Sequence, residues 1–93
     1  MSQTREKKDM VVLKGGIKYE GEWVGGFKSG TGTQIWPDGA KYEGEWLKGK
    51  ASGKGKFTHV EGDTYDGEWK DDKAHGYGVY IHYKTGAKYE GYW

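Results

Sequence analysis

One five-residue pattern returns four times along the chain at an almost constant distance. It reads Tyr, Glu or Asp, Gly, any residue, Trp, and it occupies residues 19–23, 42–46, 65–69 and 89–93. The starting tyrosines are separated by 23, 23 and 24 residues. A constant period of this length is typical of repeat architectures, in which each unit packs on its neighbours. The repeat therefore constrains the fold more than any other feature of the chain.

A second motif keeps phase with the first. Seven residues after the Trp, each of the first three copies is followed by Gly-x-Gly, at residues 30–32, 53–55 and 76–78. In residues 19–23, Tyr19, Gly21 and Trp23 alternate with Glu20 and Glu22, and this period of two predicts a β-strand. Each unit then carries a two-residue candidate for a tight hairpin turn, at Gly25-Gly26, Lys48-Gly49 and Asp71-Asp72. Each unit is thus predicted to form a β-hairpin.

With these pairs as the loop residues, the cross-strand register of each hairpin follows by counting. The predicted pairs are Val24 with Phe27, Gly21 with Gly30, Tyr19 with Gly32, Tyr42 with Gly55 and Tyr65 with Gly78. A glycine opposite a tyrosine leaves room for the aromatic ring to lie over bare backbone. We therefore interpret the Gly-x-Gly motif as a packing device.

The connections between units also have turn composition. Residues 37–39 (Pro-Asp-Gly) and 60–62 (Val-Glu-Gly) are predicted to be three-residue loops with Gly in the left-handed conformation. Such loops place Tyr42 beside Gln34 and Tyr65 beside Phe57. Residues 83–86 are one residue longer, so a bulge or a wider loop is expected there.

Because every connection is a hairpin, the predicted fold is all-β: a single-layer antiparallel meander of tandem hairpins with about eight short strands. The 18 glycines and the 16% aromatic content favour rings stacked over glycine backbone. One face is expected to carry Tyr19, Trp23, Trp36, Tyr42, Trp46, Phe57, Tyr65, Trp69, Tyr80, Tyr89 and Trp93. Strong twist should curl this face into a semi-open aromatic groove.

The ends of the chain differ from the repeats. Residues 1–9 lack apolar periodicity and are predicted to be a disordered charged tail, before an array over residues 10–93. Residues 10–16 resemble a degenerate half unit that caps the array. The fourth copy ends at Trp93 without a Gly-x-Gly strand, so we expect a fragment of a longer array. The alternative is an edge that pairs with another molecule, including a homodimer through this C-terminal edge.

Composition argues against several classes of function. The formal net charge of +1 does not predict nucleic-acid binding. No segment approaches the roughly 20 apolar residues that span a bilayer, and the N-terminus lacks the apolar region of a secretion signal. The absence of Cys excludes disulfides and thiolate metal sites and favours the cytoplasm.

The polar residues do not suggest catalysis. His59, His75 and His82 are expected to pack structurally rather than bind a metal, with His59 and His82 about 19 Å apart, four strand spacings. Paired carboxylates such as Glu43 and Glu45 are expected on the solvent face beside cross-strand lysines. The Gly-x-Gly motif precedes a strand, so no helix N-terminus is available for a phosphate loop. No catalytic residue, metal or cofactor is predicted.

Two features remain as candidate binding sites. A single-layer sheet cannot hide all of its rings, so part of the groove is expected to receive an amphipathic helix or an extended peptide. The predicted anchors lie at the centre of the array: Tyr42, Trp46, Tyr65 and Trp69. A local cluster of lysines offers contact with anionic lipid headgroups instead: Lys48, Lys50, Lys54 and Lys56. A solvated face is the simpler interpretation of that cluster.

The three complete units resemble MORN (membrane occupation and recognition nexus) repeats, whose pattern is close to Y-x-G-x-W/F-x-x-G-x-x-x-G-x-G followed by an aromatic run and Gly. The resemblance covers about residues 10–93. Asp72 departs from the pattern, because it replaces the Gly that Gly26 and Gly49 retain. MORN arrays occur in junction proteins between membranes, in plant lipid kinases, in flagellar radial-spoke and cytoskeletal proteins and ahead of a methyltransferase domain.

What the resemblance implies is a module for protein scaffolding or membrane attachment, with catalysis left to other domains. We therefore expect a non-enzymatic scaffold that binds a peptide or helix, in a cytoskeletal or ciliary setting in the cytoplasm. The alternatives are a peripheral module that binds anionic phospholipids and the regulatory part of a larger lipid kinase.

Overall fold

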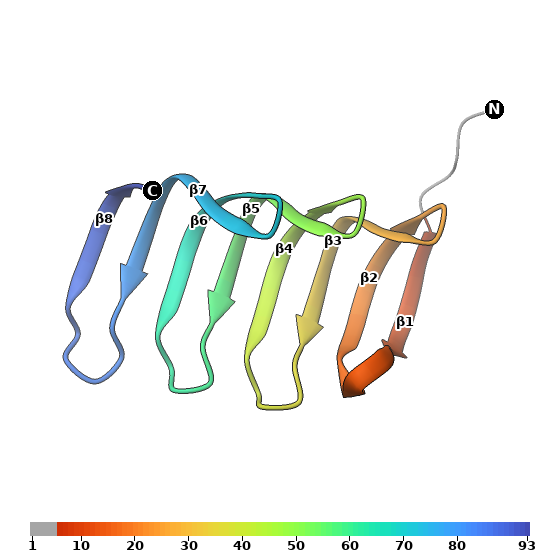
Figure 1. Cartoon of the computed structure of the whole chain (residues 1–93), viewed down its shortest axis with the longest axis horizontal. Helices are drawn as coiled ribbons and strands as arrows, with labels where there is room; N and C mark the ends of the chain where they lie inside the picture. The colour runs from red at the N-terminus through yellow and green to blue at the C-terminus, as the bar shows by residue number, and fades with distance from the viewer. Residues whose placement is uncertain (1–5) are drawn as a thin grey trace.

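The computed structural model describes residues 6–93, without the side chain of Lys8. Its eight strands form one antiparallel sheet in chain order, a single layer of consecutive hairpins (Figure 1). The strands are β1 (Glu6–Val12), β2 (Lys18–Val24), β3 (Phe27–Ile35), β4 (Lys41–Leu47), β5 (Lys50–Thr58), β6 (Thr64–Lys70), β7 (Lys73–Ile81) and β8 (Lys88–Tyr92). A short 3₁₀ turn, η1 (Lys14–Gly16), joins β1 to β2. The predicted fold class is confirmed.

The tight turns lie at the predicted residues. Val24 pairs with Phe27, so Gly25 and Gly26 form a two-residue loop, and both have positive φ, at 56° and 82°. Positive φ at both positions is the signature of the type I′ turn, whose twist matches that of the flanking strands. The equivalent pairs at residues 48–49 and 71–72 have the same conformation.

The loops between units also match the prediction. Trp36 N–H donates to Ala40 O and His59 N–H donates to Asp63 O, so each bond closes a three-residue loop. In the third connection His82 N–H donates to Ala87 O, and the loop is one residue wider. Across the loops, Gln34 pairs with Tyr42 and Phe57 with Tyr65, as predicted.

The register within each hairpin differs from the prediction. Beyond the turn, Trp23 pairs with Lys28, but Gly21 pairs with Gly32 rather than Gly30, and Tyr19 pairs with Gln34 rather than Gly32. The same correction applies to the other predicted pairs, because Tyr42 lies opposite Phe57 and Tyr65 opposite Tyr80.

A β-bulge is the cause of this shift. Between the pairs Trp23–Lys28 and Gly21–Gly32, one residue of β2 opposes three residues of β3. The first Gly of each Gly-x-Gly motif supplies the left-handed conformation that the bulge needs, with φ of 88°, 82° and 79° at Gly30, Gly53 and Gly76. Counting from the turn could not detect the extra residues.

The packing role of the second Gly holds in a different geometry. A Cβ atom at Gly32 would overlap the ring of Tyr19, and one at Gly55 would overlap the ring of Tyr42. Each tyrosine ring therefore lies over a glycine of the neighbouring strand that is diagonal to the tyrosine rather than directly opposite it.

The N-terminal segment contradicts part of the predicted tail. Residues 6–9 belong to β1, where Glu6 pairs with Trp23 and Lys7 with Glu22. The free edge of β2 offers a row of backbone hydrogen-bonding groups, and pairing with them overrides the polar composition. Residues 1–5 of the predicted tail lie outside the described residues.

The core is a layer of aromatic rings on one face of the sheet. Its central cluster of buried residues consists of Tyr19, Tyr42, Trp46 and Ala51, and half-buried side chains pack against it: Leu13, Trp23, Trp36, Phe57 and Trp69. Tyr65 and Ala40 are buried as well. Among the described residues no helix is long and apolar enough to cross a bilayer.

Candidate partner-binding groove

Eight rings form one continuous series along the array, alternating tryptophan and tyrosine. Neighbouring rings meet edge to face, with centroids 4.9–5.5 Å apart and interplanar angles of 75–89°. In spatial order the rings are Trp23, Tyr19, Trp46, Tyr42, Trp69, Tyr65, Trp93 and Tyr89. Edge-to-face contacts place the positive edge of one ring on the negative face of the next. Each tryptophan from Trp46 onward thus joins its own tyrosine to the tyrosine of the preceding unit.

Hydrogen bonds hold the rings in place. The hydroxyl of Tyr42 donates to Glu45 O at 2.9 Å, and Nε1 of Trp46 donates to Gly32 O at 3.1 Å. The tyrosine bond recurs in all four copies of the motif. Burial raises the pKa of Tyr19 to about 12 and that of Tyr42 further, because the ionised phenolate would be desolvated.

The second acidic residue of each complete unit, a glutamate in all three, stabilises the bulge, a role that the sequence analysis missed. Oε1 of Glu45 accepts the N–H of Lys54 at 2.6 Å, and Glu22 and Glu68 accept from Thr31 and Tyr77 in the same way. A carboxylate thus satisfies a backbone donor that the bulge removes from the ladder. The available signal was the presence of Glu at this position in all three units.

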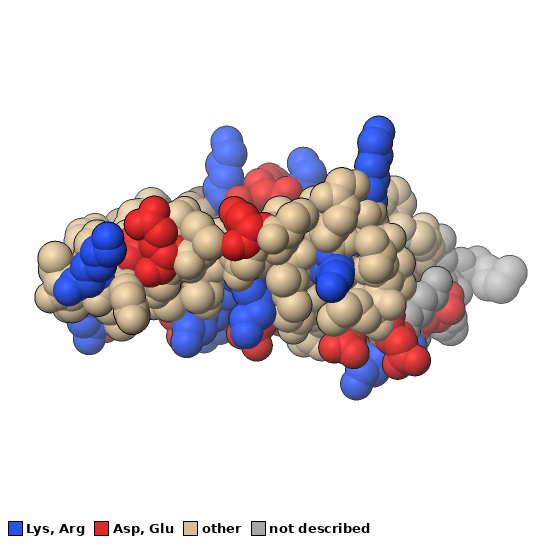
Figure 2. Space-filling model, turned by 90° about the horizontal axis from the view of Figure 1, so that it is seen from below, with Lys and Arg blue, Asp and Glu red and all other residues tan. Residues whose placement is uncertain are grey.

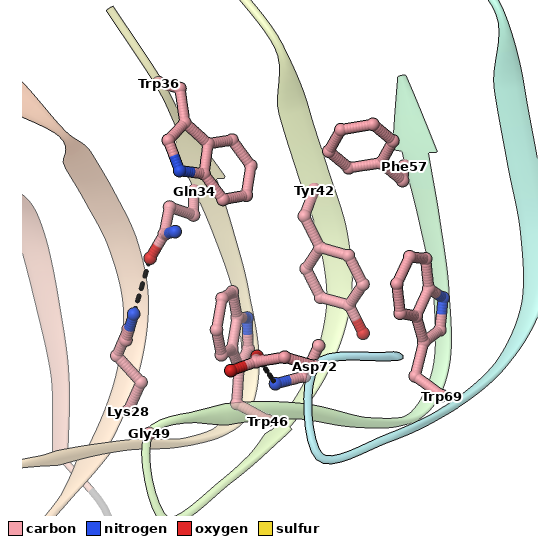
Figure 3. A pocket seen from close by; sticks show the side chains of 10 residues that line it. Lys28, Gln34, Trp36, Tyr42, Trp46, Gly49, Phe57, Trp69 and Asp72 are labelled. Carbon is pink, nitrogen blue, oxygen red and sulfur yellow. Dashed lines mark hydrogen bonds between the residues drawn. The ribbon is translucent and has the colours of Figure 1, made fainter. Parts of the chain in front are cut away.

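A pocket opens at the centre of the aromatic face, with a volume of about 520 Å³ (Figure 3). Its walls come from strands β3 to β6 and from the turns after β4 and β6. It is lined by Lys28, Gln34, Trp36, Tyr42, Trp46, Gly49, Ala51, Phe57, Trp69 and Asp72. The expected semi-open aromatic groove therefore has a defined hollow between the first and third units.

Four lining residues break the repeat. Lys28 stands where the later units have Ala51 and Ala74, and Gln34 stands where they have Phe57 and Tyr80. Trp36 replaces a histidine, and Asp72 replaces a glycine. Because the three units share one backbone plan, they serve as internal references for one another. Lys28, Gln34 and Trp36 are close in the sequence, and the fold brings the distant Asp72 to the same pocket.

Lys28 is the most constrained of these residues. Its Nζ donates to Oε1 of the buried Gln34 at 2.5 Å and lies 4.4 Å from the ring centroid of Trp46. Burial lowers the pKa of Lys28, and the negative charge of Asp72 opposes that change. Oδ1 of Asp72 in turn accepts the N–H of Ala51 at 2.7 Å. The pocket thus contains one positive and one negative side chain, and each has its own hydrogen-bond partner.

The predicted aromatic anchors occupy different environments. Tyr42, Trp46 and Tyr65 are buried, with exposed fractions of 2%, 5% and 6%, whereas Trp69 is half-buried. Tyr42, Trp46 and Trp69 line the pocket, and Tyr65 does not. Their role in partner binding stays a prediction. Trp36 and Phe57 also line the pocket and remain half-buried, although they were not among the predicted anchors.

The four predicted lipid-contact lysines, Lys48, Lys50, Lys54 and Lys56, are exposed. Lys56 lies between Glu43 and Asp66 in the register, and Lys54 lies opposite Glu68. Carboxylates thus alternate with the lysines on the face opposite the rings. Seen from the end of the sheet that carries the loops between units, blue and red side chains are interspersed (Figure 2). The headgroup contact of these lysines stays a prediction.

The histidines lie closer than predicted. β5 and β7, which end just before His59 and His82, are separated only by β6, about 9.6 Å at the usual strand spacing, rather than four spacings. Asp63, between them, accepts the N–H of Tyr83 and the hydroxyl of Tyr80, and these bonds lower its pKa. The described residues contain no group of three or more His, Cys, Asp or Glu suited to a metal ion. Asp63 therefore joins two loops.

Together, the sheet and its groove define a class of protein: a solenoid of β-hairpins that presents one aromatic face. The MORN repeat family matches residues 19–41, 42–64 and 65–84. This chain belongs to the MORN repeat family. A comparison with curated proteins gives no significant match. MORN repeats generally mediate interactions with proteins or membranes, and MORN proteins are typically non-enzymatic interaction modules.

Proposed function

We propose that the chain is a non-enzymatic scaffold module that binds a helical or extended segment of a partner protein in its aromatic groove. The observation that carries this proposal is the pocket of about 520 Å³ between the aromatic rings of three units. Pockets that bind side chains are mostly apolar and contain a few placed polar groups. Lys28, Gln34 and Asp72 supply such groups among the rings.

The accessibility of the rings supports the same proposal. The buried Tyr42 and Trp46 form a rigid floor, while Trp36, Phe57 and Trp69 are half-buried around it. Half-buried tryptophan and phenylalanine side chains offer a large contact area with little conformational entropy to lose. A bound partner segment would bury these half-buried rings, as the second layer does in a two-layer fold.

Peptide selection tests this proposal. A random 16-residue peptide library is selected on the immobilised chain, and the affinity of enriched synthetic peptides is then measured by calorimetry. In the variants Gln34→Phe and Trp36→His, the pocket residue becomes the one that other units carry, so the fold is expected to be preserved. Each variant is expected to weaken binding at least about fivefold, the effect of losing about 1 kcal/mol at an interface.

The matched control is Ile35→Thr, which also introduces a residue of the second unit but does not line the pocket. It should leave peptide affinity unchanged. The proposal fails when no selected peptide binds, or when the pocket variants bind as tightly as the wild type.

A second candidate function is peripheral binding to anionic membranes. Phe27 and Leu47 are 58% and 55% exposed at the ends of neighbouring hairpins, and Lys48 and Lys50 lie beside Leu47. Exposed apolar groups next to lysines suit the headgroup region of a bilayer. The interspersed carboxylates weaken this attraction, so we place it second.

Sedimentation with vesicles of pure phosphatidylcholine, or of phosphatidylcholine with phosphatidylserine, tests membrane binding. Pelleting with the anionic vesicles alone, lost as salt rises, would support it. A Lys48→Glu, Lys50→Glu variant should then remain in solution. Absence of pelleting at low salt would contradict the membrane proposal and leave the peptide proposal unaffected.

A further inference from the structure

We propose that the pocket receives a lysine or arginine side chain of the partner segment, with its cationic group over the rings of Trp69 and Tyr42 and near Asp72. This inference rests on the proposed function, because it specifies the chemistry of the peptide that the groove binds. It follows from comparing equivalent residues of the first and second units.

In the first unit, the chain supplies its own cation. Nζ of Lys28 lies 4.4 Å from the ring centroid of Trp46 and 5.7 Å from that of Tyr19. These two rings also contact each other, at 5.5 Å. The adjoining tryptophan and tyrosine thus form an aromatic site that binds an ammonium group within the fold.

The same pair of rings recurs one unit later without its lysine. Trp69 and Tyr42 meet at 5.2 Å and 89°, nearly the geometry of Trp46 and Tyr19. At the position equivalent to Lys28 stands Ala51, whose methyl group cannot place a charge over these rings. Ala51 lines the pocket together with Tyr42 and Trp69. Figure 3 labels the two aromatic residues. The space that a lysine fills in the first unit is therefore part of the open pocket in the second.

The second unit also gains a carboxylate beside this space. Asp72 replaces the glycine of the other two turns, although its φ of 68° is a conformation that favours glycine. Its Oδ1 accepts from Ala51 N–H, and its Oδ2 makes no hydrogen bond within residues 6–93. The charge of Asp72 reaches Tyr42, whose pKa is raised chiefly by burial and Glu45 and further by Asp72. A cation at this place would meet both the ring faces and a negative charge.

An acidic side chain is a weaker match for the same pocket. The ammonium of Lys28 already donates to Gln34 and lies over Trp46, so it has little capacity left to bind an acidic group of a partner. Lys28 lies on β3 and Ala51 on β5, about 9.6 Å apart at the usual strand spacing, with Asp72 hydrogen-bonded to Ala51. Asp72 therefore lies beside the place of the incoming cation, and its charge also acts on Lys28, where it opposes the lowering of the pKa by burial.

The test uses two probes that differ in one charged group: N-acetyl-lysine N-methylamide and N-acetyl-norleucine N-methylamide. Binding to the whole chain is followed by the tryptophan Nε1–H resonances in ¹H–¹⁵N spectra. The lysine probe is expected to shift the resonance of Trp69 and to bind about two- to fivefold more tightly than the norleucine probe.

Two variants locate this binding. Asp72→Asn keeps an oxygen that can accept from Ala51 N–H, and it should weaken the lysine probe about two- to fivefold relative to Asp66→Asn, an equal charge change on the opposite face. Ala51→Lys supplies the internal cation that the first unit has and should abolish the shift of Trp69. If Ala51→Lys fails to fold, the two Asn variants decide.

The inference is overturned when both probes bind equally, or when Asp72→Asn and Asp66→Asn behave alike. If selected peptides still bind in the groove in that case, the proposed function stands and only the cationic anchor is ruled out. Enrichment of Lys or Arg at one position of those peptides, sensitive to Asp72→Asn alone, would support both.

Discussion

At the scale of single residues, the second Gly of each Gly-x-Gly motif is required by the ring above it. A Cβ at Gly55 would lie under 3 Å from three atoms of the Tyr42 side chain. That ring cannot move aside, because it packs against Trp46 and Trp69 and its hydroxyl donates to Glu45 O. The glycine is therefore a contact residue of the core.

Gly55→Ala is accordingly expected to lower the free energy of unfolding by about 2–3 kcal/mol, as overpacking does in well-packed cores. The measurement is urea denaturation followed by tryptophan fluorescence. Gly86→Asn is the control, because Gly86 has a φ of 72° with open space around it, and Asn tolerates this conformation. Equal stability of Gly55→Ala and the wild type would show that the ring does not lie over the glycine.

The buried tyrosines also predict a dependence of stability on pH. Burial raises the pKa of Tyr19 from 10.0 to about 12, and it raises the pKa of Tyr42 and Tyr65 as well. The folded chain therefore retains protons that the unfolded chain releases, so this contribution is complete below pH 10 and is lost as pH rises toward 12.

The free energy of unfolding should thus fall between pH 10 and pH 12, measured by urea denaturation at each pH. Tyr19→Phe removes one of the titrating groups, so its stability should decline less steeply over the same interval. Identical slopes for the variant and the wild type would contradict the assignment to Tyr19.

At the scale of elements, the hairpin depends on a bulge as well as a turn. The turns and connecting loops could be predicted because Gly, Asp and Pro report local backbone conformation directly. The bulge could not, since counting from residues 25–26 assumes an uninterrupted ladder, whereas Gly30 inserts a left-handed residue. The predicted composition of the aromatic face was still correct, because a register shift of two residues leaves every side chain on the same face of the sheet.

The candidate site was predictable to a smaller extent. The repeat identified the rings of the groove, but exposure depends on how each ring packs on the next unit. Three of the four chosen anchors, Tyr42, Trp46 and Tyr65, are therefore buried, and the half-buried Trp36 was not chosen. Lys28 follows a turn and Asp72 lies within one, positions that composition assigns to solvent, and only the stacking of units brings them to one pocket.

The glutamate that supports each bulge gives a prediction at this scale. Glu45→Ala should lower the free energy of unfolding by about 1 kcal/mol, because the N–H of Lys54 loses a charged acceptor in the bulge. Glu43→Ala on the same strand is the matched control. It removes only an exposed ion pair with Lys41, so a change within about 0.5 kcal/mol is expected. Equal losses in the two variants, measured by urea denaturation, would contradict a special role for Glu45.

At the scale of the whole molecule, we propose that one face of a single sheet performs two tasks. The series of edge-to-face rings holds neighbouring units together, because the tryptophan of one unit contacts the tyrosine of the preceding one. The same layer has no second sheet or helix over it in the described chain. The pocket on this face is lined by several residues in which the units differ. Stability thus follows from what the repeats share, and we assign binding to the residues in which they differ.

The most direct measurement for this account is a map of where a selected peptide contacts the chain, from ¹H–¹⁵N chemical shifts during titration. The account predicts that the indole resonances of Trp36 and Trp69 shift at saturation, while the backbone resonances of Glu43 and Lys56 on the opposite face stay unchanged. Shifts confined to the opposite face or to the hairpin ends around Phe27, with the pocket tryptophans unaffected, would show that the aromatic groove is not the binding surface.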